Sequence, residues 1–389
     1  MSKIKKLVII GGGFAGLRAL YNLSEYNYHF EITLIDKSEY SLEKPALLEV
    51  AIEGKDKQDV NIFLPPLLRE HNCAYVNEEV DSIDTQKQRV YLKNGESVYY
   101  DYLLIASGMQ NKIAIKGFSE FGYSLCTANE AKELYNAIKN FKSKAVTIYL
   151  PDNSIFEGVA LELALALREK LKSADITLVT QKDELFDNLG PKTKKKSKKL
   201  LKKKDIKLLE QKEIVEITQE SIKCADGSEL LSDITISFPT LELAEFIKNS
   251  NFDSQKSGII TDEKMRVSGF ENIFAIGDIN SKSQPKLGFL AIHEADVASS
   301  YITNVENVEE PMDLVEFNPE ILYVANIDKL EGLLLYTNVK FGGSIDKAWI
   351  SPLAKFMKMA FSKEYYYTNG KLPPQNFIKR LEKILKSID

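Results

Sequence analysis

The feature that most constrains the fold is the opening segment KLVIIGGGFAGLRALYNL, in which a glycine-rich turn joins an apolar run to a helix with an apolar face. Gly11 permits the tight turn, Gly13 lets the backbone approach a pyrophosphate, and Gly16 lets the helix pack closely on the strand. The N-terminus of such a helix attracts the anion. The next apolar run, EITLID, ends at Asp36, where a carboxylate can bind ribose hydroxyl groups. The pattern predicts a strand–turn–helix unit that binds a dinucleotide.

The length and charge of the chain exclude several classes of protein. At 389 residues it fits two or three domains. A formal charge of −5 provides no general attraction to nucleic acid, and the longest apolar runs fall far short of the roughly 20 residues that a membrane-spanning helix needs. The apolar run near the N-terminus stops too early for a signal peptide. We therefore expect a globular protein in the cytoplasm.

Cysteine and histidine residues are too scattered for two other kinds of centre. The three cysteines form no C-x-x-C pair, so a local dithiol redox centre is not expected. The three histidines lack the spacing of metal ligands. The sequence therefore predicts no metal site.

Two later segments indicate which dinucleotide is bound. YDYLLIASG, residues 100–108, predicts a buried strand that ends in a turn of small residues. NIFAIGDI, residues 272–279, predicts a second strand that ends in Gly-Asp. In this order, after the opening unit, the two segments resemble signatures of FAD enzymes that have two dinucleotide-binding domains.

Further segments extend the resemblance over nearly the whole chain: EKPALLEVAIEG, GYSLCTANEA, QPKLGFLAIHEADVASSYI and LAKFMKMAFSKEYYYTNGK. Together they resemble the sulfide:quinone oxidoreductases, with the type II NADH dehydrogenases as wider relatives. The resemblance implies an α/β fold with two Rossmann-like FAD/NAD(P)-binding domains of the pyridine nucleotide-disulfide oxidoreductase type, and a C-terminal α+β region that contacts a membrane. The expected bounds are 1–110 and 250–305 for the FAD-binding domain, 111–249 for the second domain and 317–389 for the C-terminal region.

The resemblance also implies that the chain binds FAD. Asp278 would bind the ribityl chain. Lys286 would lie beside the isoalloxazine, where a cation stabilises negative charge on the reduced ring or on a quinone oxygen. The residues expected to bind FAD are Gly11, Gly13, Phe14, Ala15, Gly16, Asp36, Lys37, Lys44, Pro45, Val80, Ala106, Ser107, Gly108, Gly277, Asp278, Lys286, Leu287 and Gly288.

Sulfide oxidation in this family depends on two flavin-facing cysteines, because the thiolate is the nucleophile. The resemblance puts Phe156 where the first should be, and residues 323–325, near the expected position of the second, contain no cysteine. Cys126 matches a less essential family cysteine. It could be a flavin-proximal thiol, a sulfur acceptor or a buried small residue. We expect the usual two-cysteine relay not to operate.

A second strand–turn–helix unit, AVTIYLPDNSIFEGVALELALAL, is predicted to have lost its dinucleotide. Its turn has Asn153, Phe156 and Gly158 in place of the glycine pattern. The following strand, ITLVTQK, carries Lys182 instead of an acidic residue that would bind an NAD ribose. Both differences disfavour NADH.

The residues expected to do chemistry are Glu162, Lys286 and Cys126. Glu162 matches a family glutamate that could relay protons to a reduced quinone, or it could simply meet solvent or a lysine. His293 and Glu294 could hydrogen-bond a quinone head, or His293 could cap its helix.

Two segments could contact other molecules. Residues 192–204, KTKKKSKKLLKKK, form either a solvated helix face or a contact for an anionic membrane or an acidic electron-transfer partner. Ser351 and Pro352 predict the start of an amphipathic helix, and a second is expected after LPP. These helices could lie in a membrane interface, pack on the protein's own core or meet a second copy in a homodimer. Their apolar stripes are Trp349, Leu353, Phe356, Met357 and Ala360 in the first, and Phe377, Leu381, Ile384, Leu385 and Ile388 in the second.

The leading hypothesis is an FAD-dependent oxidoreductase of the sulfide:quinone oxidoreductase type, peripheral on the cytoplasmic face of the membrane or in the cytoplasm. It would pass electrons from a small-molecule donor, with a sulfur species among the candidates, to a quinone. One alternative is a type II NADH:quinone dehydrogenase-like enzyme. Another is a flavin-bearing binding or regulatory protein without turnover.

Overall fold

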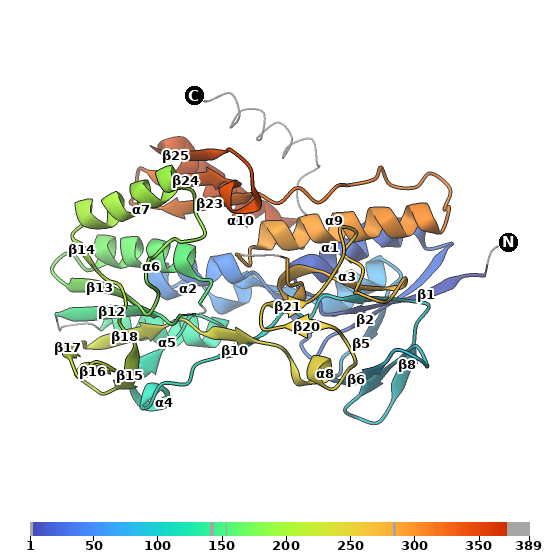
Figure 1. Ribbon diagram of the computed structural model, residues 1–389, viewed down its shortest axis with the longest axis horizontal. Coiled ribbons are helices and arrows are strands. Elements are labelled where there is room, and N and C mark those ends of the chain that lie inside the picture. The colour runs from blue at the N-terminus through green and yellow to red at the C-terminus, as the bar shows by residue number, and fades with distance from the viewer. Residues whose placement is uncertain (1–2, 141–143, 153, 283–284, 372–389) are drawn as a thin grey trace.

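The first of two large sheets contains the N-terminal strand. The computed structural model describes residues 3–140, 144–152, 154–282 and 285–371. Five parallel strands lie in the order β22-β9-β1-β2-β5 (Figure 1). They are β1 (Lys5–Ile10), β2 (Phe30–Ile35), β5 (Ala74–Val76), β9 (Tyr102–Ile105) and β22 (Ile273–Ala275). Because β22 comes late in the sequence, the chain leaves this sheet and returns to it, as the resemblance implies.

Both faces of this sheet are covered. Helices α1 (Phe14–Leu23) and α9 (Gly288–Val305) pack together over one face (Figure 1). Leu17, Leu20 and Leu23, on the apolar face of α1, are fully buried. An ion pair of 2.5 Å between Arg18 and Asp296 joins the two helices. The other face is covered by the antiparallel strands β6 (Val80–Asp84), β7 (Arg89–Leu92) and β8 (Ser97–Tyr99).

The second large sheet has the order β11-β18-β12-β13-β14 and is also parallel. Its strands are β11 (Gly122–Tyr123), β12 (Ala145–Leu150), β13 (Asp175–Thr180), β14 (Ile206–Leu209) and β18 (Ile234–Ser237). The core around it includes residues of α2 (Leu47–Glu53), α5 (Ala128–Lys139), α6 (Glu157–Lys170) and α7 (Pro191–Lys203). An antiparallel sheet covers its other face, with strands β15 (Ile214–Ile217), β16 (Ser221–Cys224) and β17 (Glu229–Leu231). The sequence segment in which we expect a second nucleotide-binding unit therefore does form a strand, a turn and a helix.

Short elements lie in the segments that connect the strands of the large sheets. They are β3 (Tyr40–Leu42), β4 (Asn61–Phe63), β10 (Gln110–Lys112), β19 (Thr240–Glu242), β20 (Ser254–Gln255), β21 (Gly258–Ile259), α3 (Leu64–Glu70), α4 (Phe118–Phe121) and α8 (Glu245–Lys248).

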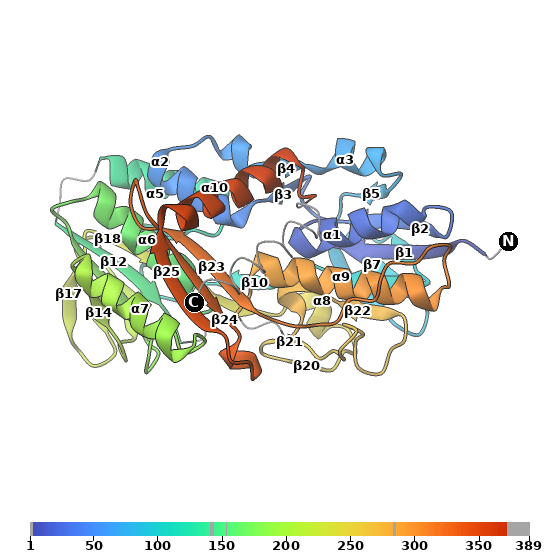
Figure 2. The ribbon, with the colours of Figure 1, turned by 90° about the horizontal axis from the view of Figure 1, so that it is seen from above.

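The C-terminal region is a three-stranded antiparallel sheet followed by a helix. It comprises β23 (Ile321–Asn326), β24 (Gly332–Thr337), β25 (Asp346–Ser351) and α10 (Pro352–Tyr367). Figures 1 and 2 show it lying above α6 and beside α7. Ala325, Ile327, Leu333 and Leu335 join the core of the second large sheet. The C-terminal sheet is thus part of that core.

Helix α10 begins where the sequence predicts, but it uses its apolar residues differently. Pro352 is its first residue, and the Ser351 hydroxyl accepts a 3.2 Å hydrogen bond from the Ala354 N–H. Trp349 lies in β25, so its assignment to the helical stripe is wrong. Leu353 and Phe356 are 53% and 59% exposed. The predicted second stripe, from Phe377 to Ile388, lies outside the described residues, and among those that are described no helix is long and apolar enough to span a membrane.

Candidate active site

The turn between β1 and α1 has the geometry of a phosphate-binding loop. Gly11 has a φ of +102°, and a Cβ there would lie 2.5 Å from the Ala106 carbonyl oxygen. A Cβ on Gly16 would lie 1.8 Å from the Gly11 carbonyl oxygen, whereas one on Gly13 would point into open space. Gly11 therefore permits the tight turn and Gly16 the close contact between helix and strand. Gly13 leaves the backbone open to a ligand, as the sequence predicts.

The N-terminus of α1 is available to an anion. Gly13 is the N-cap residue, no side chain of the described residues caps the first turn, and that turn contains no acidic residue. The first N–H groups of a helix lack intrahelical acceptors and carry partial positive charge. This end of α1, with Phe14, Ala15 and Gly16 in its first turn, fits a pyrophosphate.

Asp36 lies at the carboxyl end of β2, as expected. Its carboxylate accepts hydrogen bonds from the N–H groups of Gly12, at 2.7 Å, and Ser38, at 2.8 Å. Because each carboxylate oxygen can accept more than one bond, these contacts hold Asp36 at the turn and leave capacity for ribose hydroxyls. Lys37 is exposed beside it, and Val80 is buried where β6 begins.

The ends of β9 and β22 close the opposite side of the turn. Ala106 donates its N–H to Ile10 at 2.8 Å, and Ser107 and Gly108 continue the chain, with a φ of +65° at Gly108. Gly277 has a φ of +78°, and a Cβ there would lie 3.1 Å from that of Ala15. A Cβ on Gly288, next to the α9 N-cap residue Leu287, would lie 3.3 Å from the Phe14 ring. These segments meet at the carboxyl edge of the sheet.

Glu294 has a role that the sequence analysis missed. It is fully buried in α9, and its carboxylate accepts a 2.6 Å hydrogen bond from the Gly277 N–H. This bond fixes the turn that presents Asp278. It accounts for the buried carboxylate of Glu294 without a quinone head as its partner. His293 accepts a 3.2 Å bond from the Asn318 N–H instead. A lone carboxylate between apolar residues of a helix is the sequence signal that could have indicated a buried partner.

Charged groups gather around Asp278. Lys44, which begins a short 3-10 helix that includes Pro45, has its ammonium 3.8 Å from the Asp278 carboxylate. Lys286 is buried and donates to the backbone carbonyl of Asn280. Burial lowers the pKa of Lys286 to about 8, and the nearby carboxylates of Asp278 and Glu294 limit the fall. At neutral pH a buried cation therefore lies beside the Asp278 turn.

Cys126 lies just before α5, within the electrostatic reach of Lys44. Burial and the neighbouring Glu130 carboxylate raise the pKa of its thiol to about 11. A thiol with such a pKa is protonated at neutral pH, and the protonated form is a poor nucleophile. Cys126 is only partly buried, and its protonated thiol argues against a sulfur acceptor, so its role stays a prediction.

Aromatic rings occupy both regions where the resemblance expects the sulfur relay. The Phe156 ring stacks on Phe238 with centroids 5.6 Å apart. A Cβ on Gly158 would lie only 2.3 Å from the Tyr323 ring, so the missing side chain at Gly158 admits that ring. Burial raises the pKa of Tyr323 well above its usual range. The two regions are thus neighbours in space, and neither presents a thiol.

Glu162 lies beneath the C-terminal region. It is buried in α6, accepts a 3.0 Å bond from the Asn326 N–H, and forms a 3.0 Å ion pair with Lys358 of α10. Of the two alternatives from the sequence, the structure therefore shows the contact with a lysine. A proton-relay role for Glu162 stays a prediction.

The turn after β12 is occupied by the protein's own charges. Glu157 begins α6, is buried, and pairs with Lys182 at 2.8 Å, while Asp187 lies 3.3 Å from the same ammonium. Burial raises the pKa of Glu157 although Lys182 opposes the rise. A pocket of about 420 Å³ beside them is lined by Asp152, Ser154, Ile155, Lys182, Asp183, Glu184 and Asp187. Asn153 of this turn lies outside the described residues. The acidic lining disfavours a dinucleotide phosphate.

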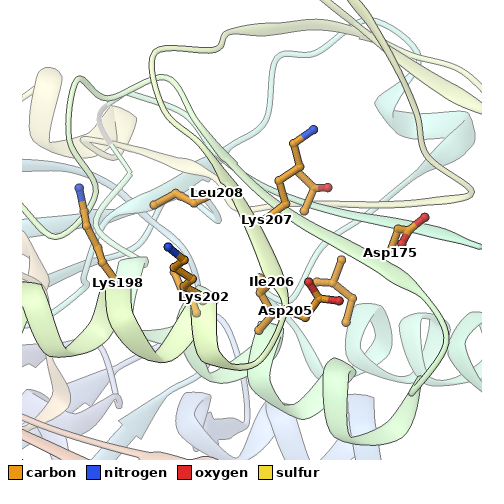
Figure 3. Close-up of a pocket in the computed structure, with 10 residues that line it drawn as sticks. Asp175, Lys198, Lys202, Asp205, Ile206, Lys207 and Leu208 are labelled. Carbon is orange, nitrogen blue, oxygen red and sulfur yellow. The ribbon is translucent and has the colours of Figure 1, made fainter.

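A larger hollow of about 610 Å³ lies away from both turns. It is bordered by α7 and by the amino ends of β13 and β14, and its lining includes Lys198, Lys202 and Lys207 (Figure 3). Ligands of parallel α/β sheets bind outside the carboxyl ends of the strands. This hollow therefore does not belong to the nucleotide-binding edge.

Comparisons with known proteins agree with this geometry. The sulfide-quinone reductase of Aquifex aeolicus is 33% identical over 175 residues, which cover 44% of this chain and 40% of that relative. A NADH dehydrogenase-like protein of Bacillus subtilis is 23% identical over 374 residues, covering 94% of this chain and 100% of that relative. The solved structure of the Aquifex aeolicus sulfide:quinone oxidoreductase superposes with a TM-score of 0.86 at 23% identity, covering 98% of this chain and 96% of the other.

The family is shown by a match that covers most of the chain. Residues 5–298, which include both large sheets, match the pyridine nucleotide-disulphide oxidoreductase family. The superposition confirms the predicted fold class, two Rossmann-like sheets in an α/β protein. The chain therefore belongs to the pyridine nucleotide-disulphide oxidoreductase family and is a flavin-dependent oxidoreductase of that superfamily.

Proposed function

We propose that this protein binds FAD in the β1–α1 site and passes electrons from a small-molecule donor other than NADH to a quinone. FAD, when bound there, would supply two-electron chemistry between donor and quinone. Gly11, Gly13 and Gly16 would hold the pyrophosphate, Asp36 the ribose and Asp278 the ribityl chain. Lys286 would place a positive charge beside the reacting ring.

The observation that carries the proposal is the contrast between the two helix N-termini. α1 has an open, uncharged first turn, whereas α6 begins with the buried carboxylate of Glu157. A carboxylate at a helix N-terminus already receives the favourable field that a phosphate would need. The first site therefore suits a dinucleotide and the second does not, which argues against NADH as the donor.

The quinone and the membrane are supported by relatives and by α10. The sulfide-quinone reductase of Aquifex aeolicus, to which this chain is similar in sequence and in fold, is named for quinone reduction. Leu353, Phe356 and Met359 expose apolar side chains on α10. Because a quinone of the respiratory type is apolar, an apolar helix that reaches a membrane interface would bring the enzyme to it.

A sulfur species remains the donor class that the family offers, but without the cysteine relay. Phe156 and Tyr323 fill the space where thiols are expected, and the raised pKa of Cys126 keeps its thiol protonated. Any sulfur donor would therefore have to reach the flavin directly. Persulfide exchange with the protein is not part of the proposal.

Anaerobic stopped-flow spectroscopy of the holoenzyme tests this function. Flavin reduced with dithionite should be reoxidised rapidly by a water-soluble quinone analogue, while NADH should bleach the oxidised flavin only slowly. Fast bleaching by NADH would instead support a type II NADH dehydrogenase. A reduced flavin that the quinone analogue leaves unchanged would contradict the proposal and favour a binding protein. Steady-state turnover of sulfide at ordinary enzyme rates would contradict our interpretation of Phe156.

Replacement of Cys126 by serine is expected to change the rate of quinone reduction less than about twofold, because its thiol is protonated at neutral pH. The measurement is steady-state reduction of the quinone analogue with whichever donor reduces the flavin. Thiol labelling at neutral pH should be correspondingly slow in the wild-type protein. A loss of rate of a hundredfold in C126S would show that the thiol takes part in the reaction.

A further inference from the structure

Two sets of lysines on α7 have different surroundings, and the half-buried Lys196 belongs to neither. Lys194 and Lys198 pair with Glu184, Lys198 also pairs with Glu210, and Lys204 at the end of the helix pairs with Asp328. The second set is exposed, and none of its members belongs to an ion pair formed among residues 3–371 in the parts that the structure describes. This set, the lysine stripe, consists of Lys192, Lys195, Lys199, Lys202 and Lys203.

The lysine stripe occupies one side of the helix. At 100° per residue, the spacing of its members confines them to about a quarter to a third of the circumference. Thr193, Ser197, Leu200 and Leu201 lie on the opposite side and are buried. The helix therefore presents a continuous cationic surface to solvent, which Lys207 of β14 extends around the end of α7 (Figure 3). Asp175 and Asp205 line the same hollow, so the hollow itself is not a closed anion site.

Helix α7 is fixed at both ends to the C-terminal sheet. Asp346, the first residue of β25, accepts hydrogen bonds from the N–H groups of Lys192, at 2.6 Å, and Thr193, at 3.0 Å. A Cβ on Gly190 would lie 2.3 Å from the same carboxyl group. At the other end Lys204 pairs with Asp328, in the turn between β23 and β24, at 3.0 Å.

The turn between β23 and β24 also contacts the start of α10. The Lys355 ammonium donates to the Asp328 carbonyl at 2.7 Å, and the first turn of α10 rests on Gly332, where a Cβ would lie 2.4 Å from the Lys355 nitrogen. Leu330 in this turn is 76% exposed. Leu330 therefore lies next to the C-terminal end of α7, and α10, which exposes Leu353, Phe356 and Met359, begins at the same turn. Figure 2, seen from above, shows α7, the C-terminal sheet and α10 beside one another.

We propose that the lysine stripe of α7 and the exposed apolar residues of α10 form one docking surface for a membrane that contains anionic lipid. Anionic lipid headgroups match the charge of the stripe, and the acyl region accepts the apolar side chains beside it. An acidic protein partner would match the charge but leave the apolar residues uncovered. The inference deepens the proposed function, since it rests on a quinone that is reached at a membrane. The new element is that the lipid contact depends on the positive charge of α7, a helix that packs on the second large sheet.

Vesicle sedimentation with the full-length holoenzyme tests the inference. Binding should be stronger to vesicles with roughly one third phosphatidylglycerol than to pure phosphatidylcholine, and it should weaken at about 1 M salt, where the Debye length falls to about 3 Å. The variant K192Q/K195Q/K199Q/K202Q should bind the anionic vesicles at least about tenfold more weakly. Its binding to phosphatidylcholine should be unchanged.

Two controls separate the stripe from general effects. Lys87, Lys93, Lys112 and Lys248 are exposed, and they lie in or next to β7, β10 and α8, away from α7 (Figure 1). Replacing these four lysines by glutamine changes the net charge as much as the stripe variant does. That variant should bind anionic vesicles within about twofold of wild type, and the four lysine-to-arginine changes in the stripe should do the same because charge is kept. Equal loss in both glutamine variants, or no loss in the stripe variant, would overturn the proposal, and the second result would point to an acidic protein partner.

The docking surface and the proposed function are tested by different measurements, vesicle binding and quinone reduction. Reduction of a water-soluble quinone analogue needs no vesicle, so the stripe variant should keep the wild-type rate. If wild type reduces no quinone but its vesicle binding follows the stripe, the proposed function fails and the surface stands. If quinone reduction proceeds and vesicle binding ignores anionic lipid, the surface fails alone.

Discussion

A protein in which Gly13 is replaced by alanine is expected to fold normally and to purify without bound flavin. Gly13 has a φ of −81°, which alanine adopts freely, and its Cβ would point into open space. That space is where the pyrophosphate of a dinucleotide approaches the helix N-terminus, so the methyl group obstructs the ligand and not the fold. The ratio of flavin to protein absorbance and a thermal melt of the purified protein measure the two effects.

Gly16 supplies the matched comparison for this experiment. A Cβ there would lie 1.8 Å from the Gly11 carbonyl oxygen, so alanine must push α1 away from β1. We expect G16A to lose about 3 kcal/mol or more of stability in addition to its flavin. Full flavin content in G13A would contradict the assignment of this turn as the cofactor site. Equal destabilisation of both variants would show that Gly13 serves packing.

Replacement of Lys286 by methionine is expected to slow reoxidation of the reduced flavin by a quinone analogue at least tenfold, a loss of about 1.4 kcal/mol of transition-state stabilisation. The ammonium is buried beside Asp278 and would stabilise negative charge that develops near the reacting ring. Methionine keeps the volume and removes the charge. Stopped-flow reoxidation of holoenzyme with matched flavin content gives the rate.

We expect the rate of flavin reoxidation to depend on pH through Lys286. Since burial lowers the pKa of Lys286 to about 8, the cation is present below that pH and is lost as the pH rises through it. The wild-type reoxidation rate should therefore fall above about pH 8. K286M should lack this step, whereas K286R, whose guanidinium stays charged, should keep the rate at high pH. A wild-type step that persists in K286M would assign the titration to another group.

Much of the proposed flavin site could be predicted from sequence because its determinants are local. The turn from Gly11 to Gly16 is a short pattern in which each glycine has its own steric task, and the structure shows each task. The Gly-Asp turn at Asp278 follows a buried strand in the same way. Local strand and helix signals likewise predicted the second unit and the start of α10. The binding of FAD by the individual residues stays a prediction.

The remaining features depend on contacts between distant parts of the chain. The helical spacing from Trp349 onward is real, but Trp349 continues β25, and pairing of that strand with β24 overrides the periodic pattern. Glu162 meets Lys358, almost 200 positions later, and Glu294 meets the Gly277 N–H across a turn. Periodicity says that a side chain is buried or polar and does not say which partner it finds.

The ion pair between Glu162 and Lys358 makes the last described helix a structural member of the enzyme. Both side chains are largely buried, and the carboxylate has its other contact in the C-terminal strand that contains Asn326. A truncation before Pro352, designed to obtain a better-behaved protein for crystallisation, would remove Lys358 and leave the Glu162 carboxylate without its cation. The cost of such an orphaned buried charge is about 3 to 5 kcal/mol, a large share of what holds a typical domain together. Detergents or point changes on the outer side of α10 are therefore the gentler route to a soluble preparation.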